Sequence, residues 1–384
     1  VDLPITQAGV AVPAIGPLSG TFNTIVGESF SLSIPTTNAP VTYVVTGALP
    51  PGLTITQATG IISGVPTTPG TYALKVKASN AAGAATATGA TTQPNLEFSI
   101  VVDKLPLGSV GTFHGYVARS ASAKFTTEPN LGARFELTAQ SNGTCSGSVT
   151  EGATKKSFTG AKLVSRSGTP STHTLTAALT GTTLFIDITL DPATSTASGI
   201  LRNASGLSSA AITAWLTNPL NSSGVLIKAT DYKNPLNTFR IENTDTANGP
   251  QGFGFGSFTV AEATRALVIS GKLPDGSALT GSTFLGANNE VLIYQSLNSN
   301  RASCFGKLTV TAGSNKPLDN SIAGTLTWLK PASLPAVKDT VYAAGFGQTT
   351  PLTLDVKGGS FNAPAKGGRL LGALDQADNA QLIF

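Results

Sequence analysis

The chain of 384 residues is poor in charge, with 11% of residues charged, and rich in turn formers, with 42 glycines and 23 prolines. Its net charge of +4 comes with 24 lysines and arginines that are scattered rather than gathered on one element, which argues against nucleic-acid binding. No apolar run approaches the roughly 20 residues of a membrane-spanning helix, so we expect no membrane span. Together these features predict an all-β extracellular protein of two or three domains.

The N-terminal extension, residues 1–12, precedes the first recognisable domain and begins at Val1 in a chain without methionine. We therefore expect that an initiator and a secretion signal have been removed and that the protein is extracellular or on the cell surface. Four of its side chains are apolar without an obvious place in the next domain: Leu3, Ile5, Val10 and Val12. We expect the extension to form a strand that pairs with an exposed sheet edge; the alternative is that it is a linker from a preceding domain.

The most patterned stretch of the chain is LPPGLTITQATGIISGVPTTPGTY, residues Leu49–Tyr72. Pro50-Pro51-Gly52 cannot extend a helix, and the pairs Thr59-Gly60 and Pro69-Gly70 are favoured in turns. Between the turns, apolar and polar residues alternate with the period of a half-buried strand. The stretch therefore predicts short strands joined by turns, and it offers no candidate catalytic residue.

This stretch resembles the immunoglobulin repeats, related to cadherin-like domains, that occur in tandem in long bacterial surface proteins. Their motifs LPPGL, TG.ISG.P and GTY.....A.N..G are matched by Leu49–Leu53, Thr59–Pro66, Gly70–Tyr72, Ala78, Asn80 and Gly83. The resemblance covers residues 13–103 and implies a seven-strand-type β-sandwich that works as a spacer or adhesive unit.

The resemblance also bears on two single residues. In such sandwiches a tyrosine at the start of the sixth strand often hydrogen-bonds back to the preceding corner, so we expect a structural role for Tyr72. Cadherin-type calcium sites need clustered carboxylates, whereas the linker at residues 101–106 has only Asp103. Calcium binding is therefore not expected.

Residues beyond 107 carry a duplicated unit of roughly a hundred residues, with copy 1 at 108–230 and copy 2 at 236–384. Five segments recur in the same order: Ser146–Val149 with Ser270–Leu273, Phe158–Gly160 with Leu279–Gly281, Leu184–Asp187 with Val291–Tyr294, Ser198–Leu201 with Phe305–Leu308, and Ala214–Leu216 with Thr327–Leu329. The only two tryptophans, Trp215 and Trp328, fall at the same place at the end of each copy. The expected fold is an N-terminal Ig-like β-sandwich followed by two related β-barrel or sandwich repeats.

The C-terminal part resembles the β-rich modules near the end of large secreted bacterial surface proteins, through Gly111–Val117, Gly254–Val260 and Trp328–Pro331. Little activity is attached to those modules, so the resemblance implies location and architecture more than function. Within it, Gly252–Gly256 precedes a strand rather than a helix and is no phosphate loop. We interpret its Gly/Phe alternation as a tightly packed strand that another backbone approaches.

No residue set of the chain predicts catalysis. Both tryptophans lie in apolar strands, which favours a structural role in the core over an exposed sugar platform. His114 and His173 stand in no nucleophile or metal motif. Asp187 and Asp191 could form a glycosidase carboxylate pair if the fold brought them together, but a solvated strand edge explains them equally well. We expect no enzyme, no cofactor and no metal site.

The two cysteines, Cys145 and Cys304, lie in predicted strands of different copies. Two cysteines in an exported chain most often pair. We expect a disulfide that ties the two copies together; the alternative is two buried thiols.

Three function classes fit these observations. The first is a non-catalytic structural subunit or spacer of a bacterial cell-surface fibre, layer or stalk. Such a protein would bind copies of itself through terminal β-strands, the second of which carries Leu382 and Phe384. The second is an adhesin or carbohydrate-binding module with surface glycans as partners. The third is an accessory part of an extracellular hydrolase.

Overall fold

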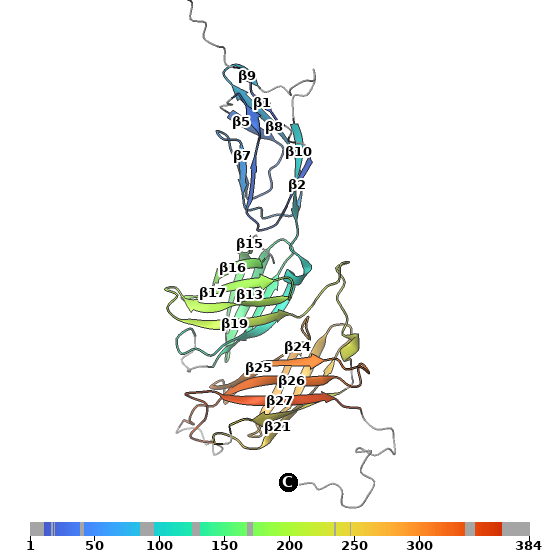
Figure 1. Cartoon of the computed structure of the whole chain (residues 1–384). Helices are drawn as coiled ribbons and strands as arrows, with labels where there is room; N and C mark the ends of the chain where they lie inside the picture. Colours follow the sequence, from blue (N-terminus) through green and yellow to red (C-terminus); the bar gives the residue numbers. More distant parts are fainter. Residues whose placement is uncertain are drawn as a thin grey trace, which may run out of the picture. The chain divides into compact units, whose positions relative to one another are not determined.

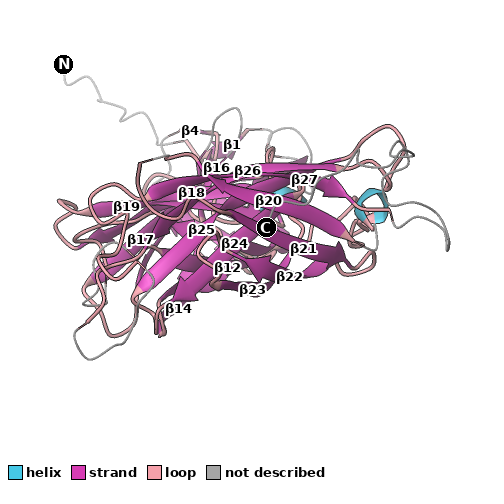
Figure 2. Cartoon of the chain, turned by 90° about the horizontal axis from the view of Figure 1, so that it is seen from below, coloured by secondary structure: helices cyan, strands magenta, loops and turns pink. Residues whose placement is uncertain are grey.

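The computed structural model describes residues 11–16, 18, 20–38, 42–84, 96–124, 131–166, 172–233, 236–245, 247–334 and 342–362. Strands dominate this part of the chain (Figure 2), and its only helices are two short 3₁₀ turns, η1 (Leu107–Ser109) and η2 (Thr230–Tyr232). Neither is long and apolar enough to cross a membrane. The all-β fold class expected from the sequence is confirmed.

The chain divides into two compact units, unit 1 (Val1–Val225) and unit 2 (Leu226–Phe384). Unit 1 contains an Ig-like domain and a barrel-like sheet, and unit 2 contains a second barrel-like sheet (Figure 1). The Ig-like strands are β1 (Ala14–Ile15), β2 (Gly20–Ile25), β3 (Phe30–Ser33), β4 (Thr36–Thr37), β5 (Thr42–Thr46), β6 (Leu53–Thr56), β7 (Ile61–Gly64), β8 (Gly70–Asn80), β9 (Gly83–Ala84) and β10 (Leu96–Asp103).

The Ig-like domain is a sandwich of two main sheets. One has the order β2-β10-β8-β5, with β9 paired to β8, and the other has the order β3-β7-β6. Strands β1 and β4 form a separate pair. In β8 the predicted alternation holds, because Leu74 and Val76 are each 1% exposed while Lys75 and Lys77 face water.

Two glycines of the stretch Leu49–Tyr72 are required for a steric reason. Gly52 has a φ of +96°, and a Cβ there would lie 2.0 Å from the carbonyl oxygen of Val65. Gly64 has a φ of +141°, and its Cβ would lie 2.1 Å from the carbonyl oxygen of Gly52. The Val65 N–H donates to the Gly52 oxygen at 3.2 Å, which holds the two backbones together. Both positions therefore require glycine.

Tyr72 makes the hydrogen bond expected of it. Its hydroxyl donates to the carbonyl oxygen of Thr68 at 3.0 Å, four residues earlier in the chain. The bond is exposed to solvent, so it fixes the corner before β8 but contributes less than a buried bond would.

Nine strands form the barrel-like sheet of unit 1: β11 (Gly111–Val117), β12 (Ala133–Ala139), β13 (Thr144–Glu151), β14 (Thr154–Lys162), β15 (Val164–Arg166), β16 (Thr172–Ala178), β17 (Leu184–Asp191), β18 (Thr196–Asn203) and β19 (Ser209–Leu216). Their order is β14-β13-β12-β11-β19-β18-β17-β16-β15, so the last strand returns to pair with the first. The alternation of β12 buries Phe135 and Leu137 completely.

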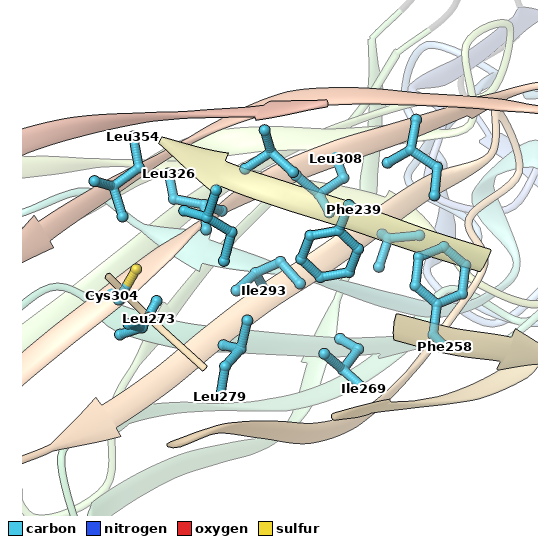
Figure 3. Close-up of a cluster of buried hydrophobic side chains, with 14 of the residues drawn as sticks. Phe239, Phe258, Ile269, Leu273, Leu279, Ile293, Cys304, Leu308, Leu326 and Leu354 are labelled. Atoms are coloured by element: carbon cyan, nitrogen blue, oxygen red, sulfur yellow. The ribbon is translucent and has the colours of Figure 1, made fainter. Parts of the chain in front are cut away.

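Eight strands form the sheet of unit 2: β20 (Asn237–Asn243), β21 (Phe253–Val260), β22 (Ala266–Lys272), β23 (Ala278–Phe284), β24 (Glu290–Leu297), β25 (Ala302–Thr311), β26 (Ser321–Leu329) and β27 (Leu352–Ser360). Their order is β23-β22-β21-β20-β27-β26-β25-β24. The two end strands meet at a bridge between Leu285 and Val291. Inward side chains from all sides fill the interior, among them Phe239, Phe258 and Ile293 (Figure 3).

The two barrel-like sheets share an up-and-down order, but their tryptophans are not equivalent. Trp215 lies on β19, which closes onto β11, whereas Trp328 lies on β26, and one more strand, β27, closes onto β20. The prediction that both residues end their copies is therefore wrong. Glycine- and threonine-rich strands resemble one another, so the two copies can be aligned one strand out of step.

Replacing Gly52 with alanine should destabilise the Ig-like domain by about 2 kcal/mol or more, because the new Cβ meets a carbonyl oxygen at a positive φ. Chemical denaturation measures the loss. The matched control is Gly16→Ala, whose Cβ would lie an ordinary 3.4 Å from the Cβ of Pro35. Equal effects of the two substitutions would contradict the steric account.

Candidate interaction surface

Both tryptophans are core residues, each with 1% of its surface exposed. The ring of Trp328 packs edge-on against Phe346, with ring centroids 4.6 Å apart. A ring that stacks on a sugar must be exposed, so the core interpretation of Trp215 and Trp328 is confirmed and neither forms a binding platform.

The two cysteines are buried thiols. Cys145 on β13 and Cys304 on β25 each have 0% of their surface exposed, and each lies in a different unit. Cys304 is enclosed by the apolar core that also contains Leu273 and Ile293 (Figure 3). The predicted disulfide is wrong in this structure, because bonding the two sulfur atoms would require each to leave the core of its own sheet. Burial raises the pKa of the Cys145 thiol to about 12, against the opposing effect of Lys162.

We expect thiol titration with a disulfide reagent to find no reactive cysteine in the native protein, since the thiolate is the reactive form and burial suppresses it. Unfolding without a reductant should release two reactive thiols. If the unfolded, unreduced protein had none, Cys145 and Cys304 would be bonded after all.

Both histidines are buried in unit 1, His114 on β11 with 6% and His173 on β16 with 0% of the surface exposed. Burial lowers the pKa of His114 to about 4; Arg134 adds to this effect and Glu136 opposes it. Burial also lowers the pKa of His173, against the opposing charge of Glu28. Among the described residues no three His, Cys, Asp or Glu side chains are placed to hold a metal ion.

Because the pKa of His114 is lowered in the folded protein, the folded state loses stability in acid. The unfolded imidazole takes up a proton near pH 6.5 and the folded one only near pH 4, so stability present above pH 6.5 is lost as the pH falls towards 4. We expect the melting temperature to fall across this window, and to fall less in a His114→Gln variant. The same pH profile in both proteins would exclude His114 as the cause.

The two aspartates considered for glycoside hydrolysis have structural partners. Asp187 forms an ion pair with Arg202 and accepts a hydrogen bond from Thr176 at 2.7 Å; the bond from Arg202 is the main cause of its lowered pKa. Asp191 accepts bonds from the Ala193 N–H and the Thr194 hydroxyl, both at 2.9 Å, and holds the next turn. Four residues apart on one strand, the two Cα atoms are about 13 Å apart, and each carboxylate is held by its own structural partners, which does not favour a glycosidase pair.

Most of the predicted assembly residues lie outside the described residues: Leu3, Ile5, Val10, Leu382 and Phe384. Val12 is described and is 37% exposed. The carbonyl oxygens of Ala11 and Val12 accept bonds, both at 2.8 Å, from the side chains of Asn80 and Asn38. The end of the predicted extension is therefore attached to the Ig-like domain.

An exposed aromatic pair lies on the outer face of unit 2, where β21 reads Gly/Phe. Phe253 and Phe255 are 60% and 58% exposed. The intervening positions face inward and have no room for a side chain: a Cβ on Gly256 would lie 2.2 Å from the ring of Phe239, and one on Gly254 would lie 2.6 Å from the carbonyl oxygen of Lys272. The interpretation of this segment as a tightly packed strand is confirmed.

Charged side chains flank the pair in two rows that cross the strands. The basic row follows the pairing of β27, β20, β21 and β22 and contains Lys357, Arg240, Phe255 and Lys272. The acidic row, two residues away along each strand, contains Asp355, Glu242 and Phe253. We call these seven residues the outer patch.

The charges of the outer patch are paired along the strands and stay accessible. Arg240 bonds Glu242 at 2.7 Å with side chains 54% and 44% exposed, and Lys357 bonds Asp355 at 2.9 Å. The guanidinium carbon of Arg240 also lies 4.6 Å from the ring centroid of Phe253. Exposed pairs of this kind contribute about 0–1 kcal/mol, so a partner can replace them at little cost.

Two depressions are less suited to recognition. A groove of about 630 Å³ in unit 2 is lined mostly by loop residues, and its one carboxylate, Asp245, is occupied by hydrogen bonds from Ala247 and Asn248. A depression of about 410 Å³ on the Ig-like domain is crossed by the ion pair of Lys75 and Glu97. Neither exposes an aromatic ring.

The outer patch was not predicted from the sequence, because apolar strand patterns suggest burial for aromatic residues in general. The signal that could have found it is the alternation of Gly252–Gly256 itself. In a strand with one buried face, glycines at the crowded inward positions place the intervening phenylalanines outside.

Residues 12–95 match the family described as "Putative Ig domain". A comparison with curated proteins finds no match. A solved structure from Bacteroides fragilis NCTC 9343, described as a "putative alpha-galactosidase/melibiase", is 30% identical over 26% of this chain and 19% of its own, with a TM-score of 0.20. A second, described as a "putative alpha-galactosidase" from the same strain, is 28% identical over 28% of this chain and 21% of its own, with a TM-score of 0.21.

The chain thus spans about a fifth of the length of these two proteins. The Bacteroides ovatus protein SGBP-B, solved with a mixed-linkage heptasaccharide, is 14% identical over 90% of this chain and 99% of its own, with a TM-score of 0.19. Such low TM-scores give no basis for transferring a function.

Proposed function

We propose, from the Ig-family domain at residues 12–95, that the chain is a non-catalytic structural segment of a bacterial cell-surface protein. In this role the Ig-like domain and the two barrel-like sheets act as a spacer, and the outer patch of unit 2 makes contact with a partner. The observation that carries the proposal is the division of unit 2 into a filled interior and an exposed aromatic face.

The filled interior supports a mechanical role. Side chains such as Phe239, Leu308 and Leu326 occupy the space that a ligand-carrying barrel would leave open (Figure 3). The polar residues that could support catalysis instead hold structure: Asp187 binds Arg202, and Asp191 holds a turn.

Assembly through terminal strands remains part of the proposal. It is supported by the apolar residues Leu3, Ile5 and Val10 in the sequence of the extension, since an apolar strand can add to an exposed sheet edge of another copy. The bonds from Asn38 and Asn80 hold only the end of the extension, at Val12 and Ala11.

Carbohydrate binding is the second candidate function. It is favoured by one observation, the exposed pair Phe253 and Phe255 beside the cation of Arg240, since exposed aromatic faces and nearby polar groups can hold a sugar.

A glycan array decides between the two candidates. The structural proposal predicts no glycan signal above background for the intact chain, and no release of sugar from polysaccharides incubated with it. The control is a Phe253→Ser/Phe255→Ser variant, which should give the same background. Binding that the double variant loses would establish the carbohydrate-binding function instead, and sugar release would establish an enzyme.

A further inference from the structure

We infer that the outer patch of unit 2 binds the outer patch of a second copy of this chain, in a two-fold symmetric face-to-face contact. The inference deepens the proposed structural function by naming its partner. It rests on the arrangement of charge and aromatic surface in the patch, which is complementary to itself.

The outer patch leaves large apolar side chains exposed to water. Phe253 and Phe255 expose more than half of their surface, 60% and 58%, side by side on one strand. Val268 on β22 is also exposed, but it lies opposite Thr259, four residues along β21 from Phe255, and is not part of the outer patch. Two adjacent exposed rings rimmed by charged groups are typical of contact sites on proteins that are otherwise covered by polar side chains.

The charges of the outer patch are arranged in two rows of opposite sign. The basic row places Lys357 and Arg240 on β27 and β20, and the acidic row places Asp355 and Glu242 on the same two strands. A two-fold axis that lies in the plane of this face and crosses the strands midway between the rows turns one row onto the other. Arg240 then faces Glu242 of the second copy, and Lys357 faces Asp355 of the second copy.

The same axis brings the aromatic residues together. Phe255 belongs to the basic row and Phe253 to the acidic row of the same strand, so each faces the other residue in the second copy. Rings that meet in this way bury apolar surface at the centre of the contact, and the ion pairs surround them. Each of the six residues paired in this way is used twice, as a two-fold contact requires.

The patch therefore favours a second copy over a glycan. On β20 and β27 it carries two cations and two anions. A second copy carries the same four charges, so each charge can face one of opposite sign. An acidic polysaccharide would meet Glu242 and Asp355 as like charges.

Sedimentation velocity on the full chain, over a range of protein concentrations, tests the contact. We expect the intact protein to form a dimer as concentration rises. Arg240→Glu places glutamate against Glu242 twice across the axis, and Glu242→Arg places arginine against Arg240 twice. Each should weaken the dimer at least about tenfold, and Phe253→Ser/Phe255→Ser should abolish it.

The double variant Arg240→Glu/Glu242→Arg is the decisive protein, because exchanging the two charges restores opposite charges across the axis. We expect it to dimerise more tightly than either single variant. Lys75→Glu, at an ion pair of 2.6 Å on the Ig-like domain, is the control and should leave the dimer unchanged. Melting temperatures of all variants show that each is folded.

Three outcomes would overturn the inference: an intact protein that stays monomeric, a dimer that none of the outer-patch variants weakens, or a double variant as weak as the single ones. None of them touches the non-catalytic role, which the glycan and sugar-release assays test separately.

Discussion

Every sheet of the molecule depends on one constraint: successive side chains of a strand point to opposite faces, so each strand must fill one side and leave the other to water. In unit 2 the inward positions are filled by large residues such as Phe239. The large ring leaves room only for glycine at position 256 of the next strand. Phe253 and Phe255 of that strand then lie on the outer face, while Phe258 points into the interior, and the outer patch is the result of how the interior is packed.

Local chemistry explains why much of the fold could be predicted from the sequence. In the Ig-like domain the turns are encoded where they occur, and Gly52 and Gly64 are needed because a Cβ at either would meet a carbonyl oxygen. The alternation in β8 assigns its faces without knowledge of any partner strand. The hydrogen bond of Tyr72 spans four residues, so its setting can also be read locally.

The parts that could not be predicted depend on contacts between distant segments. Strand β27 pairs with β20 across more than a hundred residues, so Trp328 on β26 lies on the last strand but one in chain order. A disulfide was predicted because two cysteines in an exported chain most often pair. Their positions in the sequence do not show that each sulfur is buried in the core of a different sheet. The exposure of Phe253 and Phe255 was not predicted, because an apolar residue type alone does not show on which face of a strand it lies, whereas the neighbouring glycines indicate the crowded face.

The central claim is that unit 2 acts through its outer face, with another copy of the chain as its partner. The most direct measurement is photo-crosslinking from a reactive phenylalanine analogue at position 255, in a mixture of isotopically light and heavy protein. The account predicts mixed light and heavy cross-links to peptides that contain residues 237–243 or 253–260. Cross-links confined to single chains, or to a different part of the sequence, would contradict it.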